Sequence, residues 1–410
     1  MRWRFAETNE EAAAKERALQ TMASFWAAFE ESCDTLAGEN SGTTNEIAEW
    51  MTVHLGNLEI AEWEFGPALE GDGHRLSLGT LNERHSIPML RAFVALAPPV
   101  HGWEFYAGRA RWPESWVAQQ EAHPRGWQLS VKRWRAELIP NDGKINLRMY
   151  SPEIGHLKEV EEHGGDACLA LEMALGEEMF DTWVGEVEVL SGTAKPWPWS
   201  RARPTEEYER AIPIAKLHQA LEMELQRLRS ALPSETRVAG GASELPTDND
   251  EGSEQRAGYV YRLDAEDASV NAPRFSDAFV ASTLEPALFE AVRASVFCSK
   301  NFSRLGETFC YLKLARPDIN DTDLAPRNRL TDTLEDRLIT ADLGCSYGAA
   351  CGVHYWYIDL ALVSVEDSIP IIRSVLQERA VPRDSWLLFY DSELNHEWIG
   401  IYPDTLEPDV

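Results

Sequence analysis

The pattern of apolar and polar positions predicts a long helix near the start of the chain. Over residues 10–36, apolar side chains recur at steps of three and four, which places them on one stripe of a helix. A segment rich in Gly, Ser, Thr and Asn at residues 38–45 ends this pattern. We expect the stripe to be buried; it consists of Met22, Phe25, Trp26, Phe29, Cys33 and Leu36.

Shorter patterns predict an N-terminal lobe of strands and helices that spans residues 1–194. The turn sequences Gly71-Asp72-Gly73 and Asn141-Asp142-Gly143 predict hairpins between neighbouring strands. Ser86 is placed to cap a helix that has Pro88 in its first turn. Helices are expected over residues 86–97 and 165–180, and strands over 58–65, 75–81, 103–108, 127–139, 144–150 and 182–190.

Two connecting segments follow this lobe. Residues 195–232 begin with a Pro/Trp stretch that cannot be helical, and leucines at helical spacing then predict a connecting helix over 206–232. That helix must bury its apolar seam against a lobe or a partner chain, so a homodimer held through it is one hypothesis. Residues 233–257 consist of Gly, Ser, Thr and acids with almost no large apolar side chain, which predicts a disordered acidic linker.

The C-terminal lobe is expected over residues 258–410. Ser86-Ile87-Pro88-Met89-Leu90-Arg91 resembles Ser368-Ile369-Pro370-Ile371-Ile372-Arg373, and a Trp-containing strand follows each copy. Each lobe therefore contains a strand–helix–strand unit, as in ferredoxin-like split βαβ folds. Either duplication of a lobe or independent use of the same local folding signals would explain this sequence similarity. The predicted class is α+β, with two lobes that each carry helices on one face of a mixed or antiparallel sheet. Strands are expected over 259–263, 308–315, 354–363, 386–391 and 398–402, and helices over 285–296, 330–339 and 365–378.

The balance of charge restricts the class of partner. The chain has 68 acids against 38 bases and a formal net charge of −30. Phosphate backbones and anionic membranes repel such a chain, so we expect neither nucleic acid nor membrane as partner. A basic protein partner fits this charge, and solubility alone also explains it. The first residues lack the apolar core of a signal peptide, which predicts a cytoplasmic protein.

Motifs for metals and cofactors are incomplete. Cys345, Cys351 and His354 lie close in sequence, but the gap between the cysteines is wider than in structural zinc sites, which also need a fourth ligand. Asp248–Gly252 begins like a calcium loop and lacks the glycine and glutamate that an EF-hand requires. No phosphate-binding glycine motif occurs, and we expect no cofactor.

One short motif suggests nucleophilic catalysis. Gly344-Cys345-Ser346-Tyr347-Gly348 fits the elbow that exposes a catalytic serine, and Asp391 and His396 follow in the order that such hydrolases use. An elbow must lead into a helix, whereas the residues after Gly348 predict a loop that enters a strand. We therefore prefer a glycine-rich loop, with a hydrolase using Ser346, Asp391 and His396 as the alternative.

A basic, aromatic island between residues 103 and 135 stands out in this acidic chain. Trp and Arg most often anchor protein interfaces, and they also stack within single domains. Packing within a domain, a partner-binding face and a phosphate site are all open alternatives. In an extended strand Val131 and Trp134 would face opposite sides, which would leave Trp134 outside the core that Val131 enters. The candidate partner-binding residues are Arg109, Arg111, Trp112, Trp116, Arg133, Trp134 and Arg135.

Three motifs resemble an uncharacterised family of bacterial cytoplasmic proteins, classed as a domain of unknown function. They are Phe25-Trp26-x-x-Phe29, Gly102-Trp103-Glu104, and Ala174-Leu175-Gly176-Glu177 ahead of Trp183-Val184-Gly185, and the resemblance covers residues 20–190. After Gly-Trp-Glu the family tends to continue with Phe-Arg-Pro-Arg, where this chain has Phe105-Tyr106-Ala107-Gly108-Arg109. The resemblance implies no activity and no catalytic residues.

Taken together, these features favour a non-catalytic, protein-binding role. Acidic α+β proteins of this kind include immunity-type and regulatory inhibitors of basic partners, by analogy only. The sequence therefore predicts a cytoplasmic protein that binds another protein, and it makes an enzyme the less favoured alternative.

Overall fold

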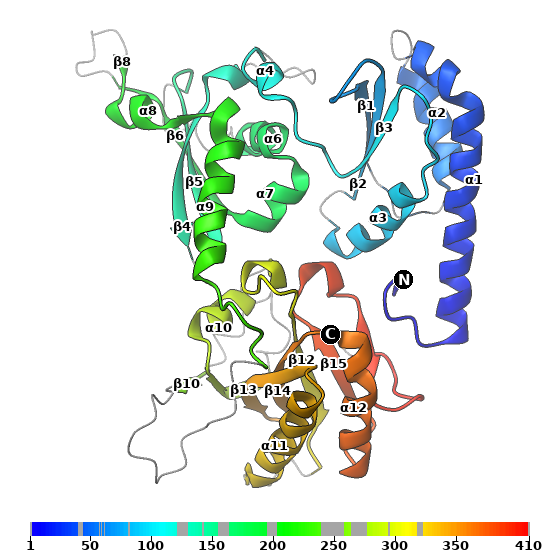
Figure 1. The fold of residues 1–410 in the computed structure, drawn as a ribbon, viewed down its shortest axis with the longest axis vertical. Helices are drawn as coiled ribbons and strands as arrows, with labels where there is room; N and C mark the ends of the chain where they lie inside the picture. Colours follow the sequence, from blue (N-terminus) through cyan, green and yellow to red (C-terminus); the bar gives the residue numbers. More distant parts are fainter. Residues whose placement is uncertain are drawn as a thin grey trace. The chain divides into compact units, whose positions relative to one another are not determined.

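The computed structural model divides the chain into two compact units (Figure 1). Unit 1 consists of Met1–Ala13 and Arg229–Val410, and unit 2 consists of Ala14–Leu228. No helix in the described part of the chain is long and apolar enough to cross a membrane. The α+β class is confirmed. The structure describes residues 2–408 except 40–43, 57, 59, 61, 81–82, 121–129, 142, 155–163, 195–202, 239–257, 264–276, 294–295 and 318–322.

Unit 1 is built on a seven-stranded sheet. Its strands follow the spatial order β10-β11-β13-β14-β12-β15-β16, and every neighbouring pair is antiparallel. The strands are β10 (Tyr259–Arg262), β11 (Ala278–Thr283), β12 (Thr308–Ala315), β13 (Gly344–Gly352), β14 (Tyr355–Leu362), β15 (Ser385–Phe389) and β16 (Trp398–Gly400).

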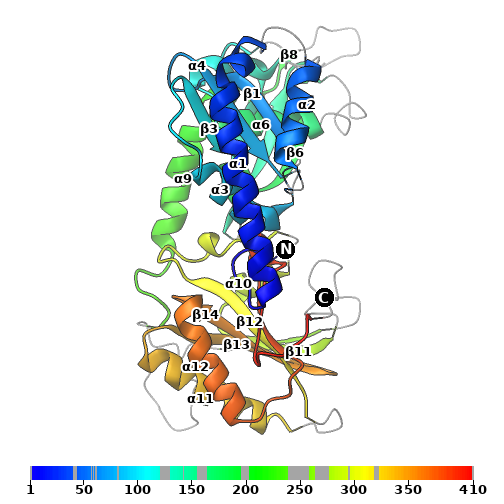
Figure 2. The ribbon, with the colours of Figure 1, turned by 90° about the vertical axis from the view of Figure 1, so that its right-hand side faces the viewer.

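Four of these strands and two helices form a ferredoxin-like core. Helix α11 (Ala325–Thr340) joins β12 to β13, and α12 (Val365–Glu378) joins β14 to β15. Each crossover passes over one intervening strand, which is the split βαβ arrangement that the sequence predicts. Figures 1 and 2 show α11 and α12 side by side, and their apolar faces share one core with the sheet.

The opposite face of this sheet carries a second core. Helix α10 (Pro286–Val292) and the segment after it bring Leu288, Phe289, Phe297 and Phe302 against aromatic residues of the central strands. The sequence predicts helices on one face only. The structure instead has α10 on the face opposite α11 and α12. The sequence analysis did not predict β11, the strand that leads directly into α10.

The first residues of the chain are bound tightly into unit 1. The carboxylate of Glu397 accepts hydrogen bonds from the backbone N–H groups of Trp3, Arg4 and Phe5, at 2.6, 2.7 and 2.9 Å. The ring of Phe5 stacks on Phe389 with centroids 5.1 Å apart. Apolar packing and charge-assisted bonds thus hold this segment to the last strands of the sheet.

The segment before residue 239 also belongs to unit 1, which corrects part of the predicted linker. Arg237 is buried and pairs with buried Glu307 at 2.9 Å, and Val238 enters the core under α10. A buried arginine requires such a partner, so residues up to 238 are fixed by this ion pair rather than disordered. The remainder of the predicted linker, residues 239–257, lies outside the described residues.

Unit 2 contains two halves with the same topology. In each half a hairpin is followed by helical structure and by a strand that runs parallel to the second strand of the hairpin. The first half contains α1 (Asn9–Glu39), α2 (Thr44–Leu55), β1 (Glu62–Pro67), β2 (His74–Gly79), α3 (Ile87–Ala95) and β3 (Trp103–Ala107). The second contains α4 (Glu114–Val117), β4 (Arg135–Asn141), β5 (Lys144–Ser151), α6 (Gly164–Leu175), α7 (Glu177–Trp183), β6 (Val184–Ser191), β7 (Thr193–Ala194), β8 (Arg203–Pro204), α8 (Glu206–Arg210), β9 (Ile212–Pro213) and α9 (Leu217–Ala231).

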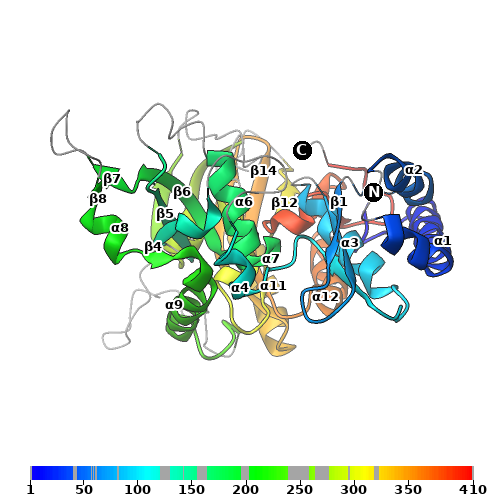
Figure 3. The same cartoon turned by 90° about the horizontal axis from the view of Figure 1, so that it is seen from above.

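An aromatic core fills the first half. The predicted stripe of α1 is buried, except that Cys33 is partly exposed, and the stripe packs on Phe93 of α3. Helix α2, which the sequence did not predict, adds Trp50 against Phe25 and Phe29. Figure 3 shows α1 and α2 side by side.

The second half differs from the prediction in its helices. The helix expected over 165–180 is broken at Gly176, whose φ is +81°, into α6 and α7. The helix expected over 206–232 is interrupted by β9, and only α9 continues it. The leucines at helical spacing are largely buried in the core of this half, so this seam is not free to hold a dimer. Ile214 just before α9 and Leu217, Leu221 and Leu225 within it are buried, and Leu228 is partly buried.

The internal echo between residues 86–91 and 368–373 corresponds to two different connections. Helix α3 joins β2 and β3, which are adjacent and parallel, whereas α12 joins β14 and β15, which flank β12. The two copies also differ locally, because residues 86–91 begin α3, whereas Ser368 and Pro370 lie inside α12, whose N-cap is Ser364. The similarity is therefore one of sequence and not of sheet topology.

The bonds from Glu397 give a test of how the first residues are held. Replacing Glu397 by Gln leaves one acceptor oxygen for three N–H groups, so Glu397→Gln should lower the free energy of unfolding by roughly 1–3 kcal/mol. Urea unfolding of the full chain measures this. Glu366→Gln is the control, because Glu366 forms an exposed pair with Arg4 and should change stability by less than about 0.5 kcal/mol. Equal effects of the two substitutions would contradict the assigned role of Glu397.

Candidate functional site

The predicted hydrolase residues are not assembled, although all three belong to unit 1. Ser346 on β13 pairs with Leu360 on β14, Leu360 with Cys310 on β12, and Cys310 with Phe389 on β15. Three strand spacings of about 4.8 Å place Ser346 roughly 14 Å from Phe389, and Asp391 lies two residues beyond it. His354, at the far end of the β13–β14 hairpin, is about 20 Å from Ser346 along the strand. Ser346 is therefore too far from both Asp391 and His354 for these side chains to act together as a triad.

Ser346 lies within β13 and not on a loop or an elbow. Its neighbour is a carboxyl group that the sequence did not reveal, that of Glu335 on α11, which lies against the backbone of Ser346. Burial, followed by the charges of Asp332 and Asp336, raises the pKa of Glu335 to about 7. One of its carboxyl oxygens is buried without a hydrogen-bond partner among the described residues.

Asp391 has a structural partner of its own. Its carboxyl group accepts hydrogen bonds from the backbone N–H of Ser299, at 2.7 Å, and from the Ser299 hydroxyl. Burial raises the pKa of Asp391 to about 6 in spite of these bonds. His396 is exposed on the turn before β16. Asp391 therefore fixes the loop that precedes β12 and does not orient an imidazole.

The cysteines considered as metal ligands lie on opposite faces of the sheet. Cys345 enters the core under α10, whereas Cys351 enters the core under α11 and α12. The same sheet therefore separates the two thiols. Within the described residues, no three His, Cys, Asp or Glu side chains form a group that could hold a metal ion.

Trp134 is fully buried, which corrects its assignment to a partner-binding face. Residues Val131–Arg133 form a 3₁₀ turn instead of continuing a strand. The turn rotates the chain, so Val131 and Trp134 enter the same core, both with 0% exposure. Strand β4 starts only at Arg135. Trp127, which was predicted on the same strand, lies outside the described residues.

Most of the remaining island residues are engaged within unit 2. The guanidinium of Arg135 donates to the backbone carbonyls of Glu209 and Ala211, at 3.0 and 3.1 Å. Trp112 and Trp116 pack edge to face, with ring centroids 6.1 Å apart. The exposed members are Arg111 and Arg133, and Arg133 pairs with Glu153 at 3.3 Å. The island is thus not one continuous exposed face.

Arg109 lies at the centre of a carboxylate cluster that joins the two halves of unit 2. Its guanidinium pairs with Glu62 of β1, at 3.0 Å, and with Glu172 of α6. Its backbone N–H donates to the carboxylate of Glu177 at 2.8 Å, and its carbonyl accepts from the backbone N–H of the same residue. Burial raises the pKa of Glu172 and of Glu177, so the single cation only partly compensates the charge of the buried carboxylates.

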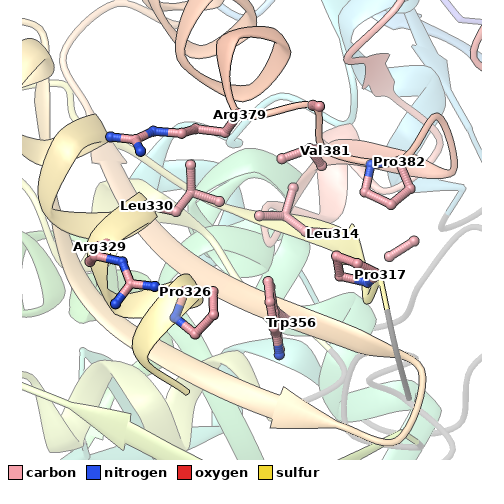
Figure 4. Close-up of a pocket in the computed structure, with 11 residues that line it drawn as sticks. Leu314, Pro317, Pro326, Arg329, Leu330, Trp356, Arg379, Val381 and Pro382 are labelled. Atoms are coloured by element: carbon pink, nitrogen blue, oxygen red, sulfur yellow. The ribbon is translucent and has the colours of Figure 1, made fainter. Parts of the chain in front are cut away.

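A pocket of about 190 Å³ opens at one end of the ferredoxin-like core of unit 1 (Figure 4). Leu314 of β12 and Trp356 of β14, which are neighbours across the sheet, form part of its wall. The start of α11 and the turn after α12 complete the lining. It consists of Leu314, Ala315, Pro317, Pro326, Arg329, Leu330, Trp356, Arg379, Ala380, Val381 and Pro382. The sequence analysis missed this site, because these residues come from four separate segments and share no motif.

Comparison of the chain with protein-family models, with curated proteins and with solved structures finds no match. The resemblance to an uncharacterised bacterial family therefore stays a prediction. Function has to be inferred from geometry and charge.

Replacing Arg109 tests the carboxylate cluster. Arg109→Met removes the cation and leaves Glu62, Glu172 and Glu177 together, so we expect a loss of about 3 kcal/mol in the free energy of unfolding at pH 7. Urea unfolding of the full chain measures it, and the loss should shrink at pH 5 as Glu172 and Glu177 take up protons. Arg148→Met removes an exposed pair with Glu188 and should change the free energy of unfolding far less than Arg109→Met does. A loss that is the same at both pH values would contradict this assignment.

The raised pKa of Glu335 predicts the sign of a pH effect. The pKa of Glu335 in the folded state, about 7, exceeds the ordinary value of 4.5, so the folded state binds a proton at Glu335 more tightly than the unfolded state does. The stabilisation of the fold by this proton is complete below pH 4.5 and is lost as pH rises through 7. Glu335→Gln should therefore stabilise the fold relative to wild type by on the order of 1 kcal/mol at pH 8, after allowance for partial exposure, and by much less at pH 5. Thermal unfolding at both pH values checks this, with the exposed Asp384→Asn as the control. A difference independent of pH would rule out a buried charge at Glu335.

Proposed function

We propose that this chain is a non-catalytic protein-binding protein that engages a basic protein partner, in the manner of an immunity-type or regulatory inhibitor. The observation that carries the proposal is the outer edge of the sheet in unit 1. There the last strand presents apolar side chains and backbone groups together.

Strand β10 is the outermost strand on its side of the sheet among the strands that the structure describes. Among the described residues it pairs only with β11, along one edge, and the N–H and C=O groups of its other edge can bind a further strand. Apolar side chains are exposed at this edge: Tyr259 at 51%, Val260 at 74% and Phe279 of β11 at 46%. Exposed apolar edges favour pairing with another chain, and several binding domains add a partner's strand in this way.

The charge near this edge indicates the kind of partner. In the sequence, acid-rich stretches precede and follow β10, at residues 239–257 and 264–276, both outside the described residues. The whole chain carries a net charge of −30. A basic segment would be attracted to such a chain, and the attraction would speed association and weaken with added salt.

The arrangement of reactive groups also supports binding over catalysis. Ser346 and Asp391 lie apart across the sheet, and Asp391 is engaged by Ser299. General acid–base or nucleophilic catalysis requires such groups within hydrogen-bond reach of one another. The alternative of a hydrolase that uses these three residues is therefore not retained.

An affinity experiment with the immobilised full chain tests the proposal. We expect it to retain one stoichiometric protein of basic isoelectric point, and retention should fall as ionic strength rises. Val260→Lys places a positive charge on the edge of β10 and should abolish retention.

Val353→Lys is the matched control, because Val353 is 50% exposed on the turn between β13 and β14, away from β10. Wild type and the Val353→Lys variant should then retain the same protein. Failure to retain any stoichiometric protein, or equal retention by the Val260→Lys variant, would refute the proposal.

A further inference from the structure

We propose that the pocket between the start of α11 and the end of α12 binds a small molecule that carries an oxyanion on an apolar body. The oxyanion is a carboxylate or a phosphate, and the body is an aromatic or branched aliphatic group. The pocket and the β10 edge are separate sites, so this proposal does not depend on the proposed function.

The inner wall of the pocket is apolar. Leu314 and Trp356 face it from adjacent strands, and Leu330 of α11 and Val381 add two more side chains that are at least nine-tenths buried. Three prolines complete this part of the lining, namely Pro317, Pro326 and Pro382. Such a surface favours an apolar body that leaves water, as in most small-molecule sites.

The rim of the pocket is cationic. Arg329 and Arg379 both line it and both are exposed, and Figure 4 shows their side chains along one side of the pocket. The guanidinium of Arg379 donates to the hydroxyl of Thr333 at 3.1 Å, and that hydroxyl donates to the carbonyl of Arg329 at 2.8 Å. Thr333 lies one helical turn after Arg329, so both cations are held beside the same face of α11.

Neither arginine forms a salt bridge with a carboxylate in the described part of the chain, although acids far outnumber bases in the sequence. Glu378, the residue before Arg379, is paired with Arg337, and the charge of Arg379 lowers its pKa only as a lesser cause. Many other arginines of unit 1 form salt bridges with carboxylates; these are Arg2, Arg4, Arg237, Arg293, Arg337, Arg373 and Arg383. Two like charges on one rim repel each other unless an anion joins them, and guanidinium groups bind carboxylate and phosphate with paired hydrogen bonds.

The start of α11 also lies at the pocket. Pro326 is in the first turn of this 16-residue helix, and the carboxylate of Asp323 accepts a hydrogen bond from the backbone N–H of Ala325 at 2.9 Å, which offsets the positive potential of this helix end. Arg327, one residue further, is buried, and among the described residues its side chain bonds only to the amide oxygen of Asn328. The C-terminus of α12 lies on the other side of the pocket. It contributes little negative potential, because the carbonyls of Leu376 and Gln377 accept hydrogen bonds from the backbone N–H groups of Val381 and Ala380.

The size of the pocket sets the size of the ligand. A volume of about 190 Å³ holds roughly six water molecules. That is enough for one ring or one branched chain with its acidic head at the rim, and too little for a nucleotide. Benzoate and phenyl phosphate therefore represent the two candidate heads on one apolar body.

Calorimetric titration of the full chain with benzoate, phenyl phosphate and neutral benzamide tests the proposal. We expect saturable binding of at least one oxyanion at millimolar concentration, and benzamide should bind at least tenfold more weakly. If only benzoate binds, the head is a carboxylate; if only phenyl phosphate binds, it is a phosphate. Arg329→Gln and Arg379→Gln should each weaken binding on the order of tenfold.

Two further variants keep the test decisive. Ala315→Phe fills the pocket and should abolish binding even if an arginine variant proves unstable. Arg293→Gln, on α10 over the opposite face of the sheet, should leave affinity unchanged. Absence of saturable binding by both oxyanions, equal binding of benzamide, or full affinity in both arginine variants would overturn the proposal.

Discussion

Antiparallel pairing across β13, β14, β12 and β15 is the constraint on which the chemistry of unit 1 depends. It places Ser346 and Phe389 at opposite ends of one cross-strand row, which keeps a serine and a carboxylate apart. The same pairing makes Leu314 and Trp356 neighbours below the start of α11. One register thus prevents a hydrolase site at one position and creates a binding pocket at another.

A second feature of the structure is which arginines are paired with carboxylates and which are not. In unit 2, Arg109 is surrounded by carboxylates and joins two halves of like topology. In unit 1, Arg237 and Glu307 form a buried pair, whereas Arg329 and Arg379 form no salt bridge among the described residues. In a chain of net charge −30, cations that are not neutralised by nearby acids indicate where an external anion is expected.

The sequence predicted elements well where periodicity was strong, as in the stripe of α1 and the bounds of α12. It failed at β13, because Gly, Ala and Cys dominate that strand and carry no β-branched signal. It also failed at Trp134, where a single 3₁₀ turn reversed the expected face. The pocket could not be predicted, because Leu314, Arg329, Trp356 and Arg379 meet only after the split βαβ crossovers have formed.

The division of the chain makes unit 2 an insertion between two parts of unit 1. During synthesis, residues 14–228 are complete before the 182 residues of 229–410 (410 minus 228) have been made. At 5–20 residues per second that interval is about 10–40 s. Unit 2 can fold in this time, whereas Trp3 and Phe5 wait for Glu397 and Phe389. The rings of Trp3 and Phe5 therefore stay accessible to chaperones until β15 and the turn with Glu397 have left the ribosome.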